Sequence, residues 1–200
     1  MEETNNAVAL CGSPCDTPKF SHTSGTENYY TFPLEIERLS GVCDRINVIA
    51  KESMLAELVL EERSRLCVEG ELRSFNNKHG EGSRLVITVF AKELAFADGE
   101  DKNSVFLSGV ICKQPNLRKT PMGRQICDLI LAVNRRYGRS DYLPCIAWGR
   151  LAERMAERQV GDAVALEGRI QSRKYIKTEN GAATERTAFE VSIVSIPEEA

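Results

Sequence analysis

Alternating apolar and polar positions in the second half of the chain predict β-strands. Leu129, Leu131 and Val133 lie at every second position, which is the period of a strand buried on one or both faces. Further apolar segments of strand length lie at residues 105–110, 143–148, 163–170 and 188–196. The pattern therefore predicts a run of strands that fills the second half of the chain.

One segment between the third and fourth of these strands has the period of a helix instead. Residues 150–158 place Leu151 and Met155 four positions apart, on one face, and surround them with arginine and glutamate. Gly161 is suited to end this helix or to make the turn after it. Five strands with a helix between the third and the fourth have the element order of an OB-fold barrel.

The first half of the chain repeats the second at an offset of 96 to 98 residues. Residues 6–12 match 103–109 in this way, and further identities follow in the same order: Pro18 with Pro115, Thr23 with Thr120, Arg38 with Arg135, Ile49 with Ile146, Leu55 with Leu151, Glu69 with Glu167 and Ser74 with Ser172. An ordered series of this length indicates two copies of one domain. We therefore predict an all-β chain of two tandem five-stranded OB-fold barrels, each with one short helix. The domains are placed at 5–95 and 103–197, with a polar linker at 96–102.

Composition places the chain among ordinary globular proteins. Of its 200 residues, 42% are hydrophobic and 28% are charged, which excludes a disordered or collagen-like chain. No apolar run approaches the roughly 20 residues of a membrane span, and the start has no signal-peptide pattern, so we expect a cytoplasmic protein. Its 7 cysteines are then expected to be reduced thiols. Cys11 and Cys15 do not have zinc-site spacing, and the chain's histidines are His22 and His79.

The net charge of −3 hides a difference between the two halves. Residues 1–100 carry 10 basic and 17 acidic residues, a balance of −7. Residues 101–200 carry 16 basic and 12 acidic residues, a balance of +4. The second half is therefore expected to attract polyanions and the first to repel them.

The second half contains several longer motifs that narrow this picture. They are Asn-Ser-Val-Phe-Leu-Ser-Gly at 103–109, Leu-Ala-Val-Asn-Arg at 131–135, Ile-Ala-Trp-Gly-Arg-Leu-Ala-Glu at 146–153, Val-Gly-Asp-Ala-Val at 160–164, Glu-Gly-Arg-Ile-Gln-Ser-Arg-Lys-Tyr at 167–175 and Phe-Glu-Val at 189–191. With these motifs the second half resembles the bacterial single-stranded DNA-binding protein family. The first half resembles it only through the repeat, as a degenerate copy. The resemblance implies OB-fold domains, sequence-tolerant binding of single-stranded DNA, and homodimers that bring together four OB domains.

Four aromatic residues stand at or near positions where this family stacks bases: Trp148, Tyr175, Tyr137 and Tyr142. The other reading is that these rings pack into the barrel with only their polar tips in water. Cations for the phosphates accompany them, and the set we expect in the interface is Arg173, Lys174, Lys177, Arg118, Arg124, Arg135, Arg136 and Arg139. Arg150, Arg154 and Arg158 on the helix have acidic neighbours and are expected to face solvent instead.

The first copy has no aromatic residue at the corresponding positions, which hold Ser40, Arg45, Lys51 and Asn77. It also carries acidic residues at Glu57, Glu61 and Glu62. We expect this copy to keep the barrel, to lose most of the binding and to supply an assembly interface. A competing interpretation makes Tyr29, Tyr30, Phe32 and Phe75 a shifted stacking platform.

The function predicted from the sequence is single-stranded DNA binding in replication, recombination or repair, in the cytoplasm at the bacterial nucleoid. The alternative is a primosomal or accessory OB-fold protein that acts mainly through protein contacts. Stacking alone does not separate DNA from RNA. No phosphate loop, zinc-protease or serine-hydrolase motif occurs, so neither an enzyme nor a cofactor is expected. The chain ends at Ala200 without the acidic, Phe-tipped tail by which the family recruits partners, which leaves protein partners open.

Overall fold

The structure is a computed structural model, and it describes residues 4–56, 65–77, 85–96, 98–179 and 182–197. The chain divides into two compact units. The carboxyl-terminal unit comprises Met1–Asn6, Ser74–Val86 and Val105–Ala200, and the amino-terminal unit comprises Ala7–Arg73 and Ile87–Ser104. Each unit is built mainly of strands and contains one short α-helix, as the sequence predicted.

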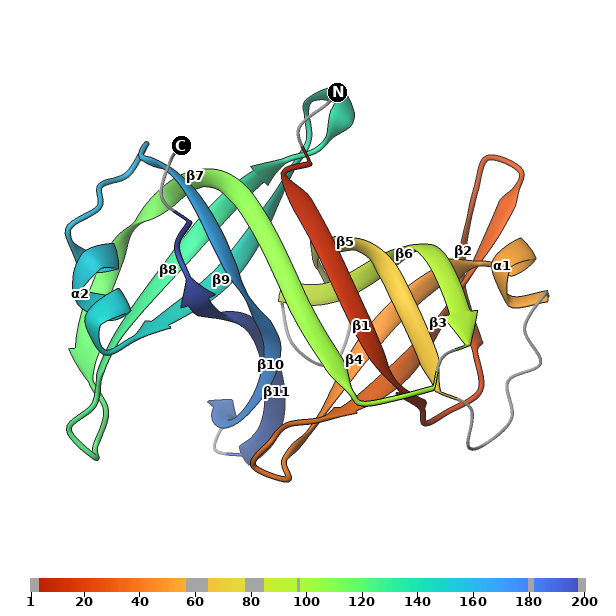
Figure 1. Cartoon of the computed structure of the whole chain (residues 1–200), viewed down its shortest axis with the longest axis horizontal. Coiled ribbons are helices and arrows are strands. Elements are labelled where there is room, and N and C mark those ends of the chain that lie inside the picture. Colours follow the sequence, from red (N-terminus) through yellow and green to blue (C-terminus); the bar gives the residue numbers. More distant parts are fainter. Residues whose placement is uncertain (1–3, 57–64, 78–84, 97, 180–181, 198–200) are drawn as a thin grey trace. The chain divides into compact units, whose positions relative to one another are not determined.

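The strands of the carboxyl-terminal unit pair in a closed order, and α2 packs beside β8 and β9 (Figure 1). Its elements are β7 (Lys102–Lys119), β8 (Gln125–Asn134), a 3-10 turn η1 (Arg136–Gly138), β9 (Ser140–Trp148), α2 (Arg150–Ala156), β10 (Ala163–Glu179) and β11 (Ala182–Ser195). β7 pairs with β8 and β8 with β9, both antiparallel. β9 pairs in parallel with β11, which pairs with β10, and β10 returns to β7. This closed order with α2 between the third and fourth strands is the OB arrangement.

The core of this barrel follows the predicted alternation. Leu129, Leu131 and Val133 are buried along β8. Met155 of α2 is fully buried. Leu151, expected beside it, is only half-buried, and α2 ends two residues earlier than the predicted 150–158. The buried face of α2 thus packs against β8 and β9 of the barrel.

The amino-terminal unit repeats this order with one interruption. Its elements are β1 (Asn6–Pro14), β2 (Lys19–Ser24), β3 (Glu27–Glu37), β4 (Cys43–Lys51), α1 (Glu52–Ala56), β5 (Leu66–Asn76) and β6 (Leu85–Phe96). β1 and β2 both pair with β3, whereas their counterpart β7 is one continuous strand. Pro14 and Pro18 flank the break. Because proline cannot donate a ladder hydrogen bond, two of them end the strand.

Two pairs of repeated glycines have a packing reason. Gly12 and Gly109 occupy equivalent positions, and a Cβ on either would collide with a backbone oxygen of the neighbouring strand, that of Glu35 or of Ala132. Gly70 and its counterpart in the second copy, Gly168, meet the same obstacle. Close approach of two strands therefore requires glycine at these points of both barrels.

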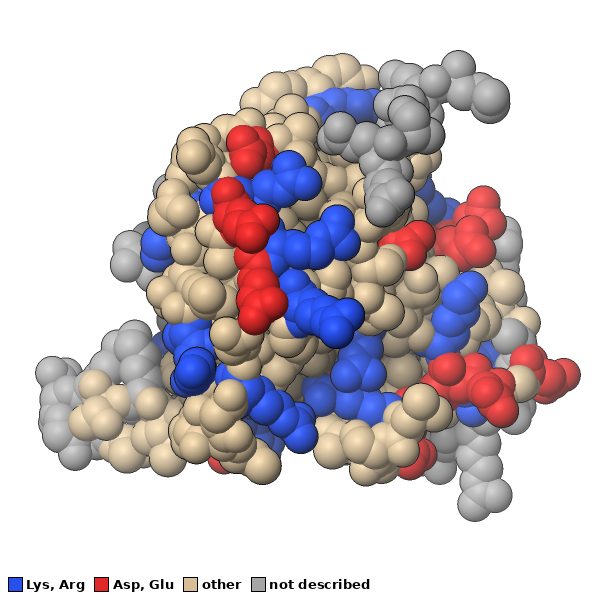
Figure 2. Space-filling model, turned by 60° about the vertical axis from the view of Figure 1, so that its left-hand side comes forward, with Lys and Arg blue, Asp and Glu red and all other residues tan. Residues whose placement is uncertain are grey.

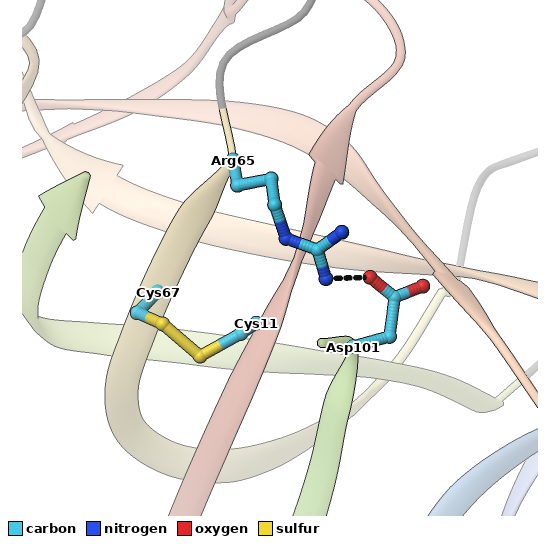
Figure 3. The surroundings of a disulfide bond; sticks show 4 residues. All are labelled: Cys11, Arg65, Cys67 and Asp101. Atoms are coloured by element: carbon cyan, nitrogen blue, oxygen red, sulfur yellow. Dashed lines mark hydrogen bonds and ion pairs between the residues drawn. A yellow bond between two sulfur atoms is a disulfide. The ribbon is translucent and has the colours of Figure 1, made fainter. Parts of the chain in front are cut away.

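A disulfide joins Cys11 of β1 to Cys67 of β5 (Figure 3). The two residues are direct partners across the antiparallel strands, with Cα atoms 4.1 Å apart. The expectation that every cysteine is a reduced thiol is therefore wrong for this pair, because strand register joins residues that are 56 positions apart. Among the free thiols, burial raises the pKa of Cys127 and Cys145.

The described residues contain no helix that is long and apolar enough to cross a membrane. Nor do the parts of the chain that the structure describes contain a group of three or more His, Cys, Asp or Glu residues that could hold a metal ion.

Candidate nucleic-acid interface

A pocket of about 480 Å³ opens beside Trp148 at the end of β9. Trp148 lies opposite Ile126 of β8, and the N–H of Gly149 donates a hydrogen bond of 3.0 Å to the carbonyl of Gln125. The pocket is lined by Lys119, Gly123, Arg124, Gln125, Trp148 and Gly149. The β7–β8 hairpin and the turn from β9 into α2 thus form its walls.

Glycine backbone geometry shapes this pocket. Gly123 closes the hairpin with φ +80°, and its N–H donates to the carbonyl of Thr120 at 2.8 Å. Gly149 has φ +57° and ψ −126°, a backbone conformation that residues with a side chain strongly disfavour. It separates the last residue of β9 from α2, so the Trp148 side chain stays outside the barrel with 38% of its surface exposed.

The chemistry of the pocket suits one nucleotide. The Trp148 ring offers a flat apolar surface for a base, while Lys119 and Arg124 offer positive charge to the adjoining phosphate. Both cations are exposed, and no carboxylate lines the pocket. Lys119 is not among the cations predicted from the sequence, and the hairpin register that places it opposite Gln125 brings it to this pocket.

The β10–β11 hairpin carries a second aromatic residue among cations. Tyr175 is half-buried and lies directly opposite Arg186 of β11. Arg173, two positions earlier, shares its face of β10, because alternate residues of a strand point the same way. Arg186 is not among the residues predicted from the sequence. The pairing register of the β10–β11 hairpin, which puts it opposite Tyr175, is the signal that would have identified it.

The structure divides the predicted cations of this hairpin. Lys174 lies on the face opposite Tyr175, and its Nζ forms an ion pair of 2.9 Å with Glu185. Lys177 is part of β10, but its side chain lies outside the described residues. Tyr175 therefore shares its face with Arg173 and Arg186 rather than with Lys174.

The remaining two predicted aromatics are exposed. Tyr137 has 98% of its surface exposed, in the η1 turn, with φ +67°. Tyr142 on β9 is 54% exposed, and its N–H donates a hydrogen bond of 2.8 Å to the Ser74 hydroxyl. Arg136 and Arg139 flank Tyr137 and are exposed as well. None of the four predicted aromatic side chains lies in the barrel core.

Besides Lys174, and Arg173 whose Nε lies 3.9 Å from a carboxylate oxygen of Glu190, two more predicted phosphate ligands are paired with carboxylates. Arg135 binds both oxygens of Asp141, a fully buried side chain, and donates a further hydrogen bond of 3.1 Å to the carbonyl of Ser74. Arg118 forms a surface ion pair with Asp128. The hydrogen bonds that its guanidinium donates to this carboxylate raise the pKa of Arg118. Arg135 therefore supports the loop before β9, and Arg118 is less available to phosphate than Arg124.

The prediction that the arginines of α2 face solvent is confirmed. Arg150, Arg154 and Arg158 are exposed, as are Glu153 and Glu157 between them. Figure 2, which brings the side of Figure 1 that carries α2 forward, shows basic and acidic side chains in adjacent rows. A surface of mixed charge creates little net attraction for a polyanion.

The amino-terminal unit differs at the corresponding positions. Arg45 forms an ion pair of 2.8 Å with Glu35, and Lys51 is half-buried opposite Tyr29. Ser40 is exposed in a turn, whereas Asn77 belongs to neither strand nor helix. Glu57, Glu61 and Glu62 lie outside the described residues.

The shifted platform of four aromatics is not a single exposed surface. Tyr29 and Phe32 are buried in the barrel core. Tyr30 is half-buried and donates a hydrogen bond of 3.1 Å to Glu52, while Phe75 is exposed. Two of the four rings are thus unable to stack on a base without leaving the core.

Comparison with known proteins gives a consistent result. The Single-strand binding protein family matches residues 102–196. Single-stranded DNA-binding protein B of Bacillus subtilis is 39% identical over 80 residues, which cover 36% of this chain and 71% of that protein. Single-stranded DNA-binding protein A of the same organism is 36% identical over 80 residues, which cover 36% of this chain and 46% of that protein. The chain thus spans about half the length of several relatives that it matches.

The fold is similar to a solved structure over both units. The wild-type single-stranded DNA-binding protein from Thermus aquaticus matches with a TM-score of 0.78 and 24% sequence identity. The match covers 98% of this chain and 93% of that one. Together with the strand pairing, this confirms the predicted fold of two tandem OB domains.

Proposed function

Because this chain belongs to the single-strand binding protein family, we propose that it binds single-stranded DNA without strong sequence preference, through its carboxyl-terminal unit. The observation that carries this proposal is the pocket that brings Trp148 together with Lys119 and Arg124. An aromatic ring accepts any base, and a cation accepts any phosphate, so the pair binds a strand whatever its sequence.

The β10–β11 hairpin extends the interface. Tyr175 provides a further stacking surface, and Arg173 and Arg186 share its face. Tyr137 and Tyr142 add exposed rings near the start of β9. A strand that follows these groups exchanges base–base stacking for base–aromatic stacking, which is worth about 1–3 kcal/mol per base.

A titration with a long oligo-dT tests the proposal. Trp148 is the chain's one tryptophan, so its fluorescence reports directly on the pocket. We expect quenching that weakens strongly between about 0.05 M and about 0.2 M salt, because phosphate binding releases counterions. Absence of both quenching and a change in anisotropy of a labelled oligo-dT at low salt would contradict the proposal.

The same titration with oligo-rU addresses the second nucleic acid. A preference for one of the two would require contacts to the 2′-hydroxyl or to the thymine methyl group. Our proposal concerns DNA, as in the relatives' names. Affinity for oligo-rU equal to that for oligo-dT would extend it to RNA.

We further propose a division of labour between the domains predicted at 5–95 and 103–197. The second binds the strand during replication, recombination or repair, and the first supplies assembly contacts in a cytoplasmic homodimer of four OB domains. What supports the division is the ion-paired Arg45 and the Lys51 at positions where the second copy carries Tyr142 and Trp148. Light scattering at micromolar concentration should give twice the mass of one chain, and a single-chain mass would contradict the dimer.

The alternative, an accessory OB protein that acts mainly through protein contacts, predicts a different titration. It would show weak affinity for oligo-dT and a shallow dependence on salt. The absence of carboxylates from the Trp148 pocket favours strand binding over this alternative.

A further inference from the structure

One row of cross-strand neighbours on the amino-terminal barrel holds two rings and a cation. His22 of β2 lies directly opposite Tyr29 of β3, and Tyr29 lies directly opposite Lys51 at the end of β4. Direct partners on neighbouring antiparallel strands carry their side chains on the same face of the sheet. The three side chains of this row therefore share one face of the barrel.

The rings of this row form a stack that is open on one side. His22 stacks on Tyr29 with ring centroids 4.9 Å apart and ring planes 7° from parallel, and Tyr29 contacts Phe90 of β6 with centroids 5.6 Å apart. The Ser21 hydroxyl lies 3.0 Å from Nδ1, at the edge of the His22 ring. Tyr29 has 9% of its surface exposed, whereas His22 and the rest of β2 are exposed. One face of the imidazole thus covers Tyr29, and the other is available to a further ring.

The carboxyl-terminal barrel has the equivalent row with ring and cation exchanged. There Arg118 of β7 lies opposite Ile126 of β8, and Ile126 lies opposite Trp148 of β9. The cation stands on the first of these three strands and the aromatic ring on the third. In the amino-terminal barrel the ring of His22 stands on the first strand and the cation of Lys51 on the third. A search for an aromatic residue at the position of Trp148 therefore misses a row that still combines a ring with a cation.

The cation of the amino-terminal row is not held by a carboxylate. Lys51 forms no ion pair with any residue that the structure describes, whereas Arg118 is paired with Asp128. Thr31 takes the place of Asp128, since each lies two residues beyond the central residue of its row. Glu27, two residues before Tyr29, is exposed, so water and salt screen its repulsion of a phosphate. A phosphate at this row therefore meets an unpaired cation.

We propose that a base of single-stranded DNA stacks on the open face of His22 and that Lys51 binds the adjoining phosphate. We call His22, Tyr29 and Lys51 the exchanged row. His22 and Lys51 stand two strands apart, about 10 Å, which a lysine side chain and one nucleotide can bridge. The base adds to an existing stack of rings, so no ring has to leave the core. This inference rests on the proposed strand binding and adds a contact of about one nucleotide in the amino-terminal barrel, where the sequence predicted little binding.

Variants of His22 test the stacking ring on the full chain. A long oligo-dT labelled with fluorescein is titrated with the protein and followed by anisotropy. His22→Ala should weaken binding about fivefold to tenfold, at the lower end of the range for one stacked base. His22→Phe keeps a ring and should bind as tightly as the parent chain. Unchanged affinity in His22→Ala, or equal weakening in His22→Phe, would overturn the proposal.

Phe20→Ala is the matched control for the ring. Phe20 is an exposed ring of the same strand, and it lies opposite Tyr30, whose side chain points to the other face of β3 from that of Tyr29. Phe20→Ala should change affinity by less than about twofold. A loss as large as that of His22→Ala would mean a general effect on the β2–β3 hairpin and would overturn the proposal.

The fluorescence of Trp148 shows whether the variants act at a distance. Trp148 is the chain's one tryptophan and lies in the other unit. Its quenching at saturating oligo-dT should be the same in His22→Ala, Phe20→Ala and the parent chain. Reduced quenching in His22→Ala would mean that the substitution acts through the carboxyl-terminal unit, which would overturn the proposal.

The cation has its own test. Lys51→Gln should reduce the slope of log affinity against log salt by about 1, because one fewer counterion is released. Lys102→Gln removes an exposed lysine of the same unit and should leave the slope nearly unchanged. Equal reductions in both variants would mean long-range attraction without a contact at Lys51 and would overturn the proposed phosphate site.

Photo-crosslinking separates failure of this inference from failure of strand binding. An oligonucleotide that carries 5-bromodeoxyuridine is irradiated with the full chain, and tryptic peptides are examined by mass spectrometry. We expect a crosslink in the tryptic peptide of residues 20–38, which contains His22 and Tyr29, as well as in peptides of the carboxyl-terminal unit. Crosslinks confined to the carboxyl-terminal unit would overturn this inference and leave the proposed function intact. No crosslink in any peptide, together with unchanged anisotropy, would contradict both.

Discussion

The guanidinium of Arg135 bonds both carboxylate oxygens of Asp141, whose side chain has no exposed surface. Arg38 and Asp44 make the same pair 97 residues earlier, with Nε–Oδ2 and Nη2–Oδ1 distances of 2.6 Å. The Arg135–Asp141 pair closes the connection between β8 and β9, and the Arg38–Asp44 pair closes the equivalent connection between β3 and β4. A repeated arginine that resembles a phosphate ligand in sequence is thus a structural residue in both copies.

This pair predicts a stability effect. Arg135→Ala leaves the Asp141 carboxylate buried without its cation, so the free energy of unfolding should fall by about 3–5 kcal/mol. Urea denaturation followed by circular dichroism measures the loss. Arg139→Ala, at an exposed position of the same loop, should change stability by less than about 0.5 kcal/mol. Similar losses in both variants would contradict the structural role of Arg135.

The aromatic residues of the carboxyl-terminal unit should carry strand affinity. Trp148→Ala and Tyr175→Ala should each weaken oligo-dT binding by about 1–3 kcal/mol, because each removes one stacking surface. Fluorescence anisotropy of a labelled oligonucleotide measures both. Phe20→Ala is the matched control, since Phe20 is an exposed ring of the other unit. Unchanged affinity in both test variants would show that neither ring stacks on a base.

Lys119 should contribute a phosphate contact. Lys119→Ala should weaken oligo-dT binding and reduce the slope of log affinity against log salt by about 1, because one fewer counterion is released. Arg154→Ala on α2 removes a cation from the surface of mixed charge and should leave the slope nearly unchanged. A slope that falls equally in both variants would argue for long-range attraction without a contact at Lys119.

The disulfide should stabilise the amino-terminal barrel. Cys11→Ser together with Cys67→Ser frees a loop of 56 residues in the unfolded chain, so the free energy of unfolding should fall by about 2–4 kcal/mol. Thermal denaturation with and without reductant measures the effect. Cys15→Ser with Cys43→Ser changes two exposed free thiols and serves as control. Parent protein that is insensitive to reductant would contradict a stabilising bond.

Much of the fold was predictable because it rests on local patterns. The alternation at Leu129, Leu131 and Val133 marks a strand whose inner face must be buried, and Met155 marks the buried face of α2. The repeat then transfers the same order to the first half. Trp148 and Tyr175 were singled out because they fit the motifs of the family that the second half resembles, and the structure places neither ring in the barrel core.

From the sequence, short periods and motifs were enough to predict two tandem OB domains, which the fold confirms, and to name four aromatic residues of the carboxyl-terminal unit, whose binding role stays a prediction. The tertiary structure alone decided which charges are available. Strand register sets Arg186 beside Tyr175 and joins Cys11 to Cys67. Burial of Asp141 engages Arg135. Such pairings connect residues on different strands, and the energy of each depends on distance and solvent exclusion, which exist only once the chain has folded.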